Sequence, residues 1–240
     1  MTMVDIRPHQ ANDYQSLPDM DTTDVGVLDS QDRACLDELG RFLVERGENE
    51  RFGVTLLHSH FPISDDEIFV EVADHAARKL VMSPRTAPES RDVSPITVQL
   101  LPREQGGQVH AIGLEYATQD AFQDAIPVGD EDAKTLSGLA EILERRHSLG
   151  RFGVRLIHDP LALCDDELLL ETCDLDARFL DSAAASIDDH RVADSVETFW
   201  RWTLEPVTGP NGAVAAQVCR HKCVKACLKD GDRHVKGDHS

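Results

Sequence analysis

Residues 51–80 read RFGVTLLHSHFPISDDEIFVEVADHAARKL, and residues 151–180 read RFGVRLIHDPLALCDDELLLETCDLDARFL. The two stretches are identical at 14 of 30 positions without a gap, at an offset of 100 residues. Chance would give about two identities, so we interpret the chain as a tandem duplication of one unit. This internal similarity determines the expected architecture more firmly than any other feature of the sequence.

An amphipathic helix is predicted upstream of each copy. Leu36, Leu39 and Leu43 follow the i, i+3, i+7 spacing of one helix face, and leucines recur at the same places 100 residues later. Gly47 and Gly150 follow the two helices and suit their exits. Each unit is therefore expected to begin with a helix whose apolar face covers a sheet.

Strands are predicted after each helix. The apolar RFGV segment indicates a strand, and the Asp-Asp-Glu sequence at 65–67 indicates a turn from which 67–72 returns as the pairing strand. A hairpin then follows in each copy, with strands at 96–102 and 108–116 or at 198–205 and 213–219. The expected fold class is α+β, with two pseudo-twofold-related halves that each hold an antiparallel sheet backed by a helix.

The chain divides into five parts on this interpretation. Residues 1–30 are polar and acidic without a sustained period, and we expect a disordered leader there. The repeat units cover 31–116 and 131–218, joined by a linker at 117–130, and 219–240 form a basic tail rich in cysteine and histidine.

Composition limits the class of function. The formal net charge of -20, from 24 basic and 44 acidic residues, disfavours nucleic acid and anionic membranes as partners. No apolar run reaches the roughly 18 residues of a membrane-spanning helix, and the N-terminal MTMVDIRPHQ lacks the pattern of a secretory signal. The sequence predicts a cytoplasmic protein that is compatible with a small-molecule substrate, and it does not indicate an oligomeric state.

The first candidate for chemistry is the pair His58 and His60. Side chains at i and i+2 of a strand share a face, so two imidazoles there can ligate one metal ion. His58 recurs as His158, which favours a structural role such as a hydrogen bond to the backbone, whereas His60 is replaced by Pro160. His60 is therefore the stronger functional candidate of the two.

The tail is the second candidate. Its ligand-type residues Cys219, His221, Cys223 and Cys227 follow a C-x-H-x-C-x3-C spacing, and the basic residues around them would favour thiolates. Thiolate and imidazole ligands suit zinc, copper or iron. Because His60 and the tail each occur in one copy only, we expect them to meet between the two repeats as a transition-metal site.

Other motifs favour structural roles because both copies keep them. The Asp-Asp-Glu turn and the pair Glu71 and Arg78 recur 100 residues later, and we expect an ion pair within each unit. Trp200 and Trp202 alternate on one strand and are expected in the core.

Three functions remain open from the sequence. The first is a metal-binding protein, with a metal-dependent enzyme of unknown reaction as its extension. The second is a non-enzymatic interaction module that docks its basic tail on an acidic partner. The third is a thiol redox protein that uses Cys223 and Cys227.

The pattern R-F-G-V-x-L-L-H-x-H-F, followed by D-D-E-I, resembles a motif of small, largely uncharacterised proteins of fungi and actinobacteria. The resemblance covers Arg51 to Glu71, and the second copy departs from the motif at Pro160. It implies no activity.

Overall fold

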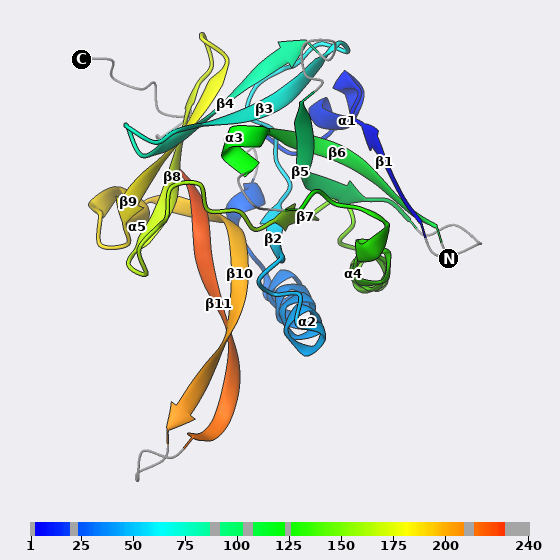
Figure 1. Ribbon diagram of the computed structural model, residues 1–240, viewed down its shortest axis with the longest axis vertical. Coiled ribbons are helices and arrows are strands. Elements are labelled where there is room, and N and C mark those ends of the chain that lie inside the picture. Colours follow the sequence, from blue (N-terminus) through cyan, green and yellow to red (C-terminus); the bar gives the residue numbers. More distant parts are fainter. Residues whose placement is uncertain are drawn as a thin grey trace.

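A closed barrel of ten strands forms the centre of the molecule in our computed structural model (Figure 1). The structure describes residues 3–19, 24–86, 92–102, 108–122, 126–208 and 214–228, with only the backbone described for 24, 205–224 and 228. The strand order is β6-β3-β4-β9-β8-β11-β10-β2-β7-β5, and the pairing of β5 with β6 closes the ring. Strand β1 adds to the outside of this ring, parallel to β6.

The elements have the following bounds. The strands are β1 (Val4–Pro8), β2 (Phe52–Leu56), β3 (Glu67–Asp74), β4 (Lys79–Thr86), β5 (Val93–Leu100), β6 (Val109–Thr118), β7 (Phe152–Leu156), β8 (Glu167–Asp174), β9 (Phe179–Ser186), β10 (Ser195–Thr208) and β11 (Val214–Leu228). The helices are α1 (Ala11–Gln15), α2 (Ser30–Arg46), α3 (Gln119–Phe122), α4 (Ala133–Arg145) and α5 (His190–Ala193), with 3-10 turns η1 (Asp24–Gly26) and η3 (Asp130–Asp132). No helix of the described residues combines the length and the apolar character needed to cross a membrane.

The mixed α and β character is confirmed, but the expected pair of separate antiparallel sheets is wrong. One sheet runs through both halves, and it contains the parallel pairs β3 with β6 and β8 with β11. The strand after the Asp-Asp-Glu turn does not pair with β2 as expected, because β3 returns along β4 instead. Strand β2 lies between β10 and β7, which both come from the second half of the chain.

Corresponding strands of the two halves meet at two seams. At the first seam, β2 pairs with β7 so that Val54 faces Val154. At the second seam, β4 pairs with β9, where Leu80 faces Ser182 and Met82 faces Leu180. Both registers stay the same when each residue is exchanged for its counterpart 100 positions away. The arrangement of the strands therefore follows the internal similarity of the sequence.

The main apolar core lies between the helices and one face of this barrel wall. Leucines of α2 and α4 pack with Val54, Val154 and Trp200 in a single buried cluster. Trp202 lies in the same cluster, which confirms the expected core position of both tryptophans. Because side chains alternate along a strand, the opposite face of β2 and β7 points into the barrel. That face carries polar side chains, among them Arg155.

The N-terminal segment is built into the fold, contrary to the expectation of a disordered leader. Strand β1 pairs with β6, and α1 follows it. Tyr14 and Leu17 are buried, and the Ser59 N–H donates to the Pro18 carbonyl at 2.9 Å. Two buried apolar side chains in a polar stretch hold this segment on the barrel, which a composition average does not reveal.

The expected tail also needs correction, because residues 219–228 belong to β11. Cys227 and Lys225 are buried, and Lys225 forms an ion pair inside the barrel rather than presenting a basic surface. Residues 229–240 lie outside the described part of the chain, as does the expected glycine turn at 106–107. The expected linker contains the end of β6 and helix α3.

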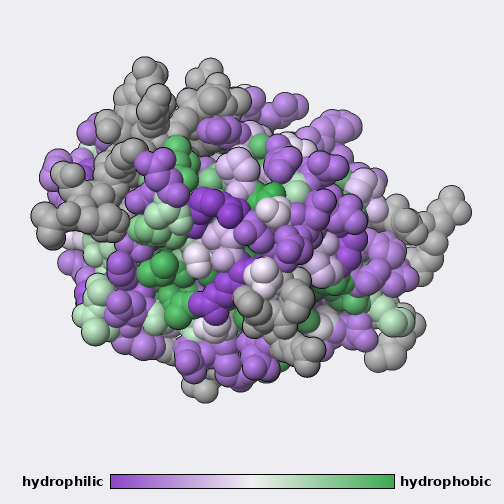
Figure 2. All heavy atoms as spheres, turned by 90° about the horizontal axis from the view of Figure 1, so that it is seen from above, coloured by the Kyte–Doolittle hydropathy of each residue, from purple (hydrophilic) through white to green (hydrophobic). Residues whose placement is uncertain are grey.

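The face of the molecule seen from above is largely hydrophilic (Figure 2). Hydrophilic residues cover most of the face in Figure 2, with small apolar groups between them.

Paired charges join the two halves: Arg51 contacts Asp132 at 2.6 Å, and Arg151 contacts Asp32 at 2.9 Å. Exchanging each residue of one ion pair for its counterpart 100 positions away gives the other pair, as it does for the strand registers.

The two helix exits give a matched test of backbone conformation. Gly47 ends α2 in the left-handed region, with φ of 71°, as the sequence predicts. Gly150 does not do so for α4, because His147 takes the left-handed position with φ of 57°. We expect Gly47→Ala to cost about 1 kcal/mol of unfolding free energy and Gly150→Ala almost nothing, measured by urea denaturation. Equal losses would contradict this assignment.

Candidate functional site

Four side chains converge inside the barrel and could hold a metal ion: His58, His60, Glu171 and Cys227. One ligand-type atom from each lies within 4.8 Å of the others. The Cys227 Sγ lies 3.5 Å from His58 Nε2 and 3.0 Å from Glu171 Oε2. The rings of His58 and His60 meet edge to face, with centroids 4.5 Å apart.

Strand geometry brings these residues together from distant parts of the sequence. His58 and His60 follow the end of β2, where the chain crosses the end of the barrel. Strands β8 and β11 run parallel, and their register places Cys227 directly beside Glu171. The cluster therefore contains two ligands from the first half of the chain and two from the second.

A hydrogen bond to the backbone orients the His58 ring. Its Nδ1 lies 2.9 Å from the Leu56 carbonyl, which can only accept, so this nitrogen carries the proton. The other nitrogen, Nε2, faces Cys227 and is the atom of this ring that could bind a metal ion. A hydrogen bond of this kind orients a ligating histidine in metal sites.

Glu171 is ionised although it is buried. Burial alone would raise its pKa, but the charge of Lys225 and the imidazoles of His60 and His58 outweigh this effect and hold the pKa well below its usual range. The Lys225 Nζ lies 2.7 Å from Oε1, and Thr198 donates to Oε2 at 3.1 Å. The carboxylate is thus fixed on one side and turned toward the cluster on the other.

Cys227 is held as a neutral thiol. Burial and the adjacent Glu171 carboxylate raise its pKa well above the usual value, and the thiol donates to that carboxylate. The basic residues of the sequence do not lower this pKa as expected, because Lys225 pairs with Glu171 instead. A buried neutral thiol is a poor nucleophile but becomes a thiolate ligand when a metal ion displaces its proton.

A cavity of about 20 Å³ adjoins the cluster and is lined by His58, His60 and Glu171. Tyr14 and Leu17 from the N-terminal segment complete its lining, and the His60 N–H donates to the Tyr14 hydroxyl at 3.2 Å. Such a cavity has room for about one water molecule. The free space beside the cluster therefore suits an ion rather than an organic substrate.

The residues that correspond to the four ligands form a second cluster, around His158 and Glu71, with a different composition. His158 keeps the bond to a strand carbonyl, at 3.3 Å from Leu156, which confirms the expected backbone role of both histidines. Its Nε2 lies 2.6 Å from Glu71. In that half, Ala117 is paired with Glu71 as Cys227 is with Glu171. Pro160 takes the place of His60. This second cluster therefore lacks counterparts of His60 and Cys227.

The conserved acids and arginines pair across the halves rather than within them. Glu71 contacts Arg155 at 2.8 Å, not Arg78. Arg78 instead contacts Glu167 at 2.7 Å, and Arg178 contacts Glu67 at 2.6 Å. The turn acids therefore have a structural role, since Glu67 and Glu167 also accept backbone N–H groups of their own turns.

Three predicted ligands stay untested. The side chains of Cys219, His221 and Cys223 lie outside the described part of the structure, although their backbone belongs to β11. Cys223 precedes Cys227 by four residues, which is about 13 Å along a strand. The backbone of β11 thus holds these two cysteines too far apart for the redox pairing expected from the sequence.

Glu171 is the ligand that the sequence analysis missed. A charged residue within the apolar run ELLLET is an available signal, because a buried carboxylate needs a charged or ligating partner. Its recurrence as Glu71 led to a purely structural interpretation. The two glutamates occupy equivalent positions, but only Glu171 has Cys227 and His60 near it.

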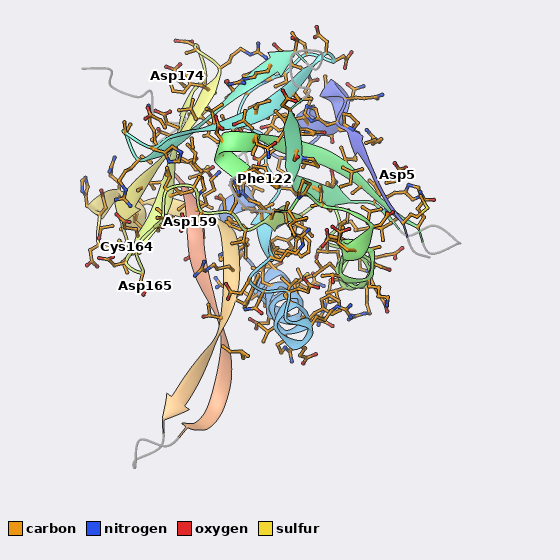
Figure 3. All side chains as sticks on the ribbon, viewed as in Figure 1. Asp5, Phe122, Asp159, Cys164, Asp165 and Asp174 are labelled. Atoms are coloured by element: carbon orange, nitrogen blue, oxygen red, sulfur yellow. The ribbon has the colours of Figure 1, made fainter. Side chains whose placement is uncertain are left out.

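Figure 3 shows that the side chains labelled Asp159, Cys164 and Asp165 come from the segment between β7 and β8, on the second half of the barrel. Cys164 is exposed and separate from the buried cysteines.

Comparisons with known protein families, with curated proteins and with solved structures found no match. The candidate function therefore rests on the geometry of the cluster.

Proposed function

We propose that this protein binds one zinc ion through His58, His60, Glu171 and Cys227. The convergence of four ligand atoms within 4.8 Å of one another supports this proposal more than any other observation. Zinc prefers four nitrogen, sulfur and oxygen ligands in a tetrahedron. Copper and iron accept similar ligands, but a closed set of four protein ligands is typical of structural zinc.

The distances suit such an ion. In a tetrahedral zinc site, a thiolate sulfur and an imidazole nitrogen lie about 3.5 Å apart. Cys227 Sγ and His58 Nε2 already lie 3.5 Å apart. The 3.0 Å contact between Cys227 and Glu171 is that of a thiol hydrogen bond, and it would lengthen when the ion replaces the proton.

The charges inside the barrel support a divalent cation. Glu71, Glu115 and Glu171 form one contact network with Arg155 and Lys225. With the histidines left out of the count, three carboxylates and two cations give this network a net charge of -1. A zinc ion with one thiolate adds +1 and brings the total to zero, which lowers the cost of burying the charges.

We infer that a duplication preceded this specialisation. The two symmetric strand seams and the exchanged ion pairs between halves support that history. The cluster around Glu171 would have gained His60 and Cys227, while the corresponding cluster around Glu71 kept His158. A closed site favours a structural or regulatory role of the ion over hydrolysis, since catalytic zinc keeps an open position.

Metal analysis of protein purified without an affinity tag tests the proposal. We expect about one zinc per chain in the unmodified protein and almost none in His60→Ala and Cys227→Ala. His158→Ala is the matched control, because this histidine occupies the corresponding position in the other half. Zinc that persists in both ligand variants, with circular dichroism showing folded protein, would refute the site.

A further inference from the structure

A second cavity, of about 90 Å³, adjoins His158, and none of the four proposed metal ligands lines it. Ile157 and His158 line it, as Leu57 and His58 line the first cavity. Leu163 and Phe199 add apolar walls. The described lining does not include the N-terminal segment that covers the first cavity, so this cavity has a different kind of access.

Arg201 is the notable polar group of this cavity. It lies two residues after Phe199 on β10, and both side chains line the cavity, whereas Trp200 and Trp202 lie in the core with α2. The Arg201 Nε is buried, and within the described part of the chain no hydrogen-bond acceptor is placed for it. A buried guanidinium donor requires an acceptor, and a carboxylate matches its planar fork.

Three of the other polar residues that line this cavity are already engaged. His158 uses one nitrogen on Leu156 and the other on Glu71. Asp159 accepts the Leu163 N–H at 3.0 Å. Glu167 pairs with Arg78, which lies in the turn just before β4, and it accepts the Cys164 N–H. The arrangement therefore leaves the Arg201 Nε–H as a donor that a ligand in the cavity could satisfy.

We propose that this cavity binds a small aliphatic carboxylate, with its acid group on Arg201 and its hydrocarbon part against Ile157, Leu163 and Phe199. The volume is too small for a nucleotide or a sugar phosphate. The acids Asp159 and Asp165 also line the cavity or its rim and disfavour multiply charged anions. A singly charged acid with a short chain fits both the size and the charge.

Titration with sodium propionate tests the proposal by NMR, using the Nε–Hε resonance of Arg201, assigned by its loss in Arg201→Lys. We expect a saturable shift with a dissociation constant of about 0.1–10 mM. Saturation-transfer signals of propionate should fall at least about tenfold in Arg201→Gln and Arg201→Lys. They should stay unchanged in Arg191→Gln, an exposed arginine paired with Asp189.

Two further probes identify the source of the carboxylate. Tighter binding of propionate than of L-alanine would indicate a simple carboxylic acid. Tighter binding of L-alanine would indicate an amino acid whose ammonium group meets Asp159. Two outcomes would overturn the proposal. One is binding of propylamine but of neither acid. The other is that propionate, up to about 50 mM, causes no saturable shift beyond that caused by sodium chloride. Zinc-free protein can be used, so this outcome is independent of the metal site.

Discussion

Glu71→Gln is expected to lower the free energy of unfolding by about 3–5 kcal/mol, because it leaves buried positive charge without its partner. Glu71 is fully buried and contacts Arg155 at 2.8 Å and His158 at 2.6 Å. Breaking one member of a buried ionic network costs more than the network contributes as a whole. Urea denaturation should show a lower midpoint with an unchanged slope.

A surface ion pair gives the control. Glu67→Gln removes the partner of Arg178, which is 38% exposed, so the loss should stay within about 1 kcal/mol. Similar losses in the two variants would mean that the interior network does not carry buried charge. Loss of slope along with the midpoint would instead indicate a change in the folded state.

The same residue should make stability depend on pH. Burial alone would raise the pKa of Glu71, but Arg155 and His158 outweigh it and hold the folded-state pKa below the ordinary 4.5. A depressed carboxyl pKa stabilises the fold above the unfolded value, and this contribution is lost as pH falls below it. We expect the unfolding free energy to decrease below about pH 4.5, and less steeply in Glu71→Gln than in the unmodified protein.

Zinc at about 1,000 times its dissociation constant is expected to raise the free energy of unfolding by about 4 kcal/mol. Binding to the folded chain alone shifts the equilibrium, and the four ligands come together only when β2, β8 and β11 are in place. Thermal unfolding with added zinc, and again after chelation, measures the effect. His60→Ala should remove most of it.

Two comparisons make this result specific. His158→Ala should retain the zinc-dependent increase even if its own baseline stability is lower. Cys164→Ser should also retain it, because this cysteine is exposed and lies outside the cluster. An increase that survives in His60→Ala and Cys227→Ala would mean that zinc binds elsewhere on the acidic surface.

The sequence predicts local features of this fold well. Both long helices, the strands that begin at Phe52 and Phe152, and the hairpins of β5 with β6 and β10 with β11 follow from periodicity and turn residues. These features depend on neighbours along the chain. Strand β4 was not predicted, because KLVMSPRT contains a proline and only weak alternation.

Partner choice between strands could not be read from local pattern. The local pattern of an apolar strand such as β2 fits several neighbours, and only the structure shows that it pairs with β7 and β10. The same limit applies to the site. His58, His60 and Cys227 were predicted from residue type, whereas Glu171 required knowledge of the parallel register beside Cys227.

The exchange of β2 and β7 between the halves has a consequence for synthesis of the chain. Strand β2 has both of its neighbours in the second half, and β7 has both of its neighbours in the first. While the ribosome has produced only the first half, β2 and β4 have unsatisfied edges that invite pairing with other chains. Ring closure must wait for β10 and β11, so the edges of the earlier strands stay open to other chains until this hairpin has been synthesised.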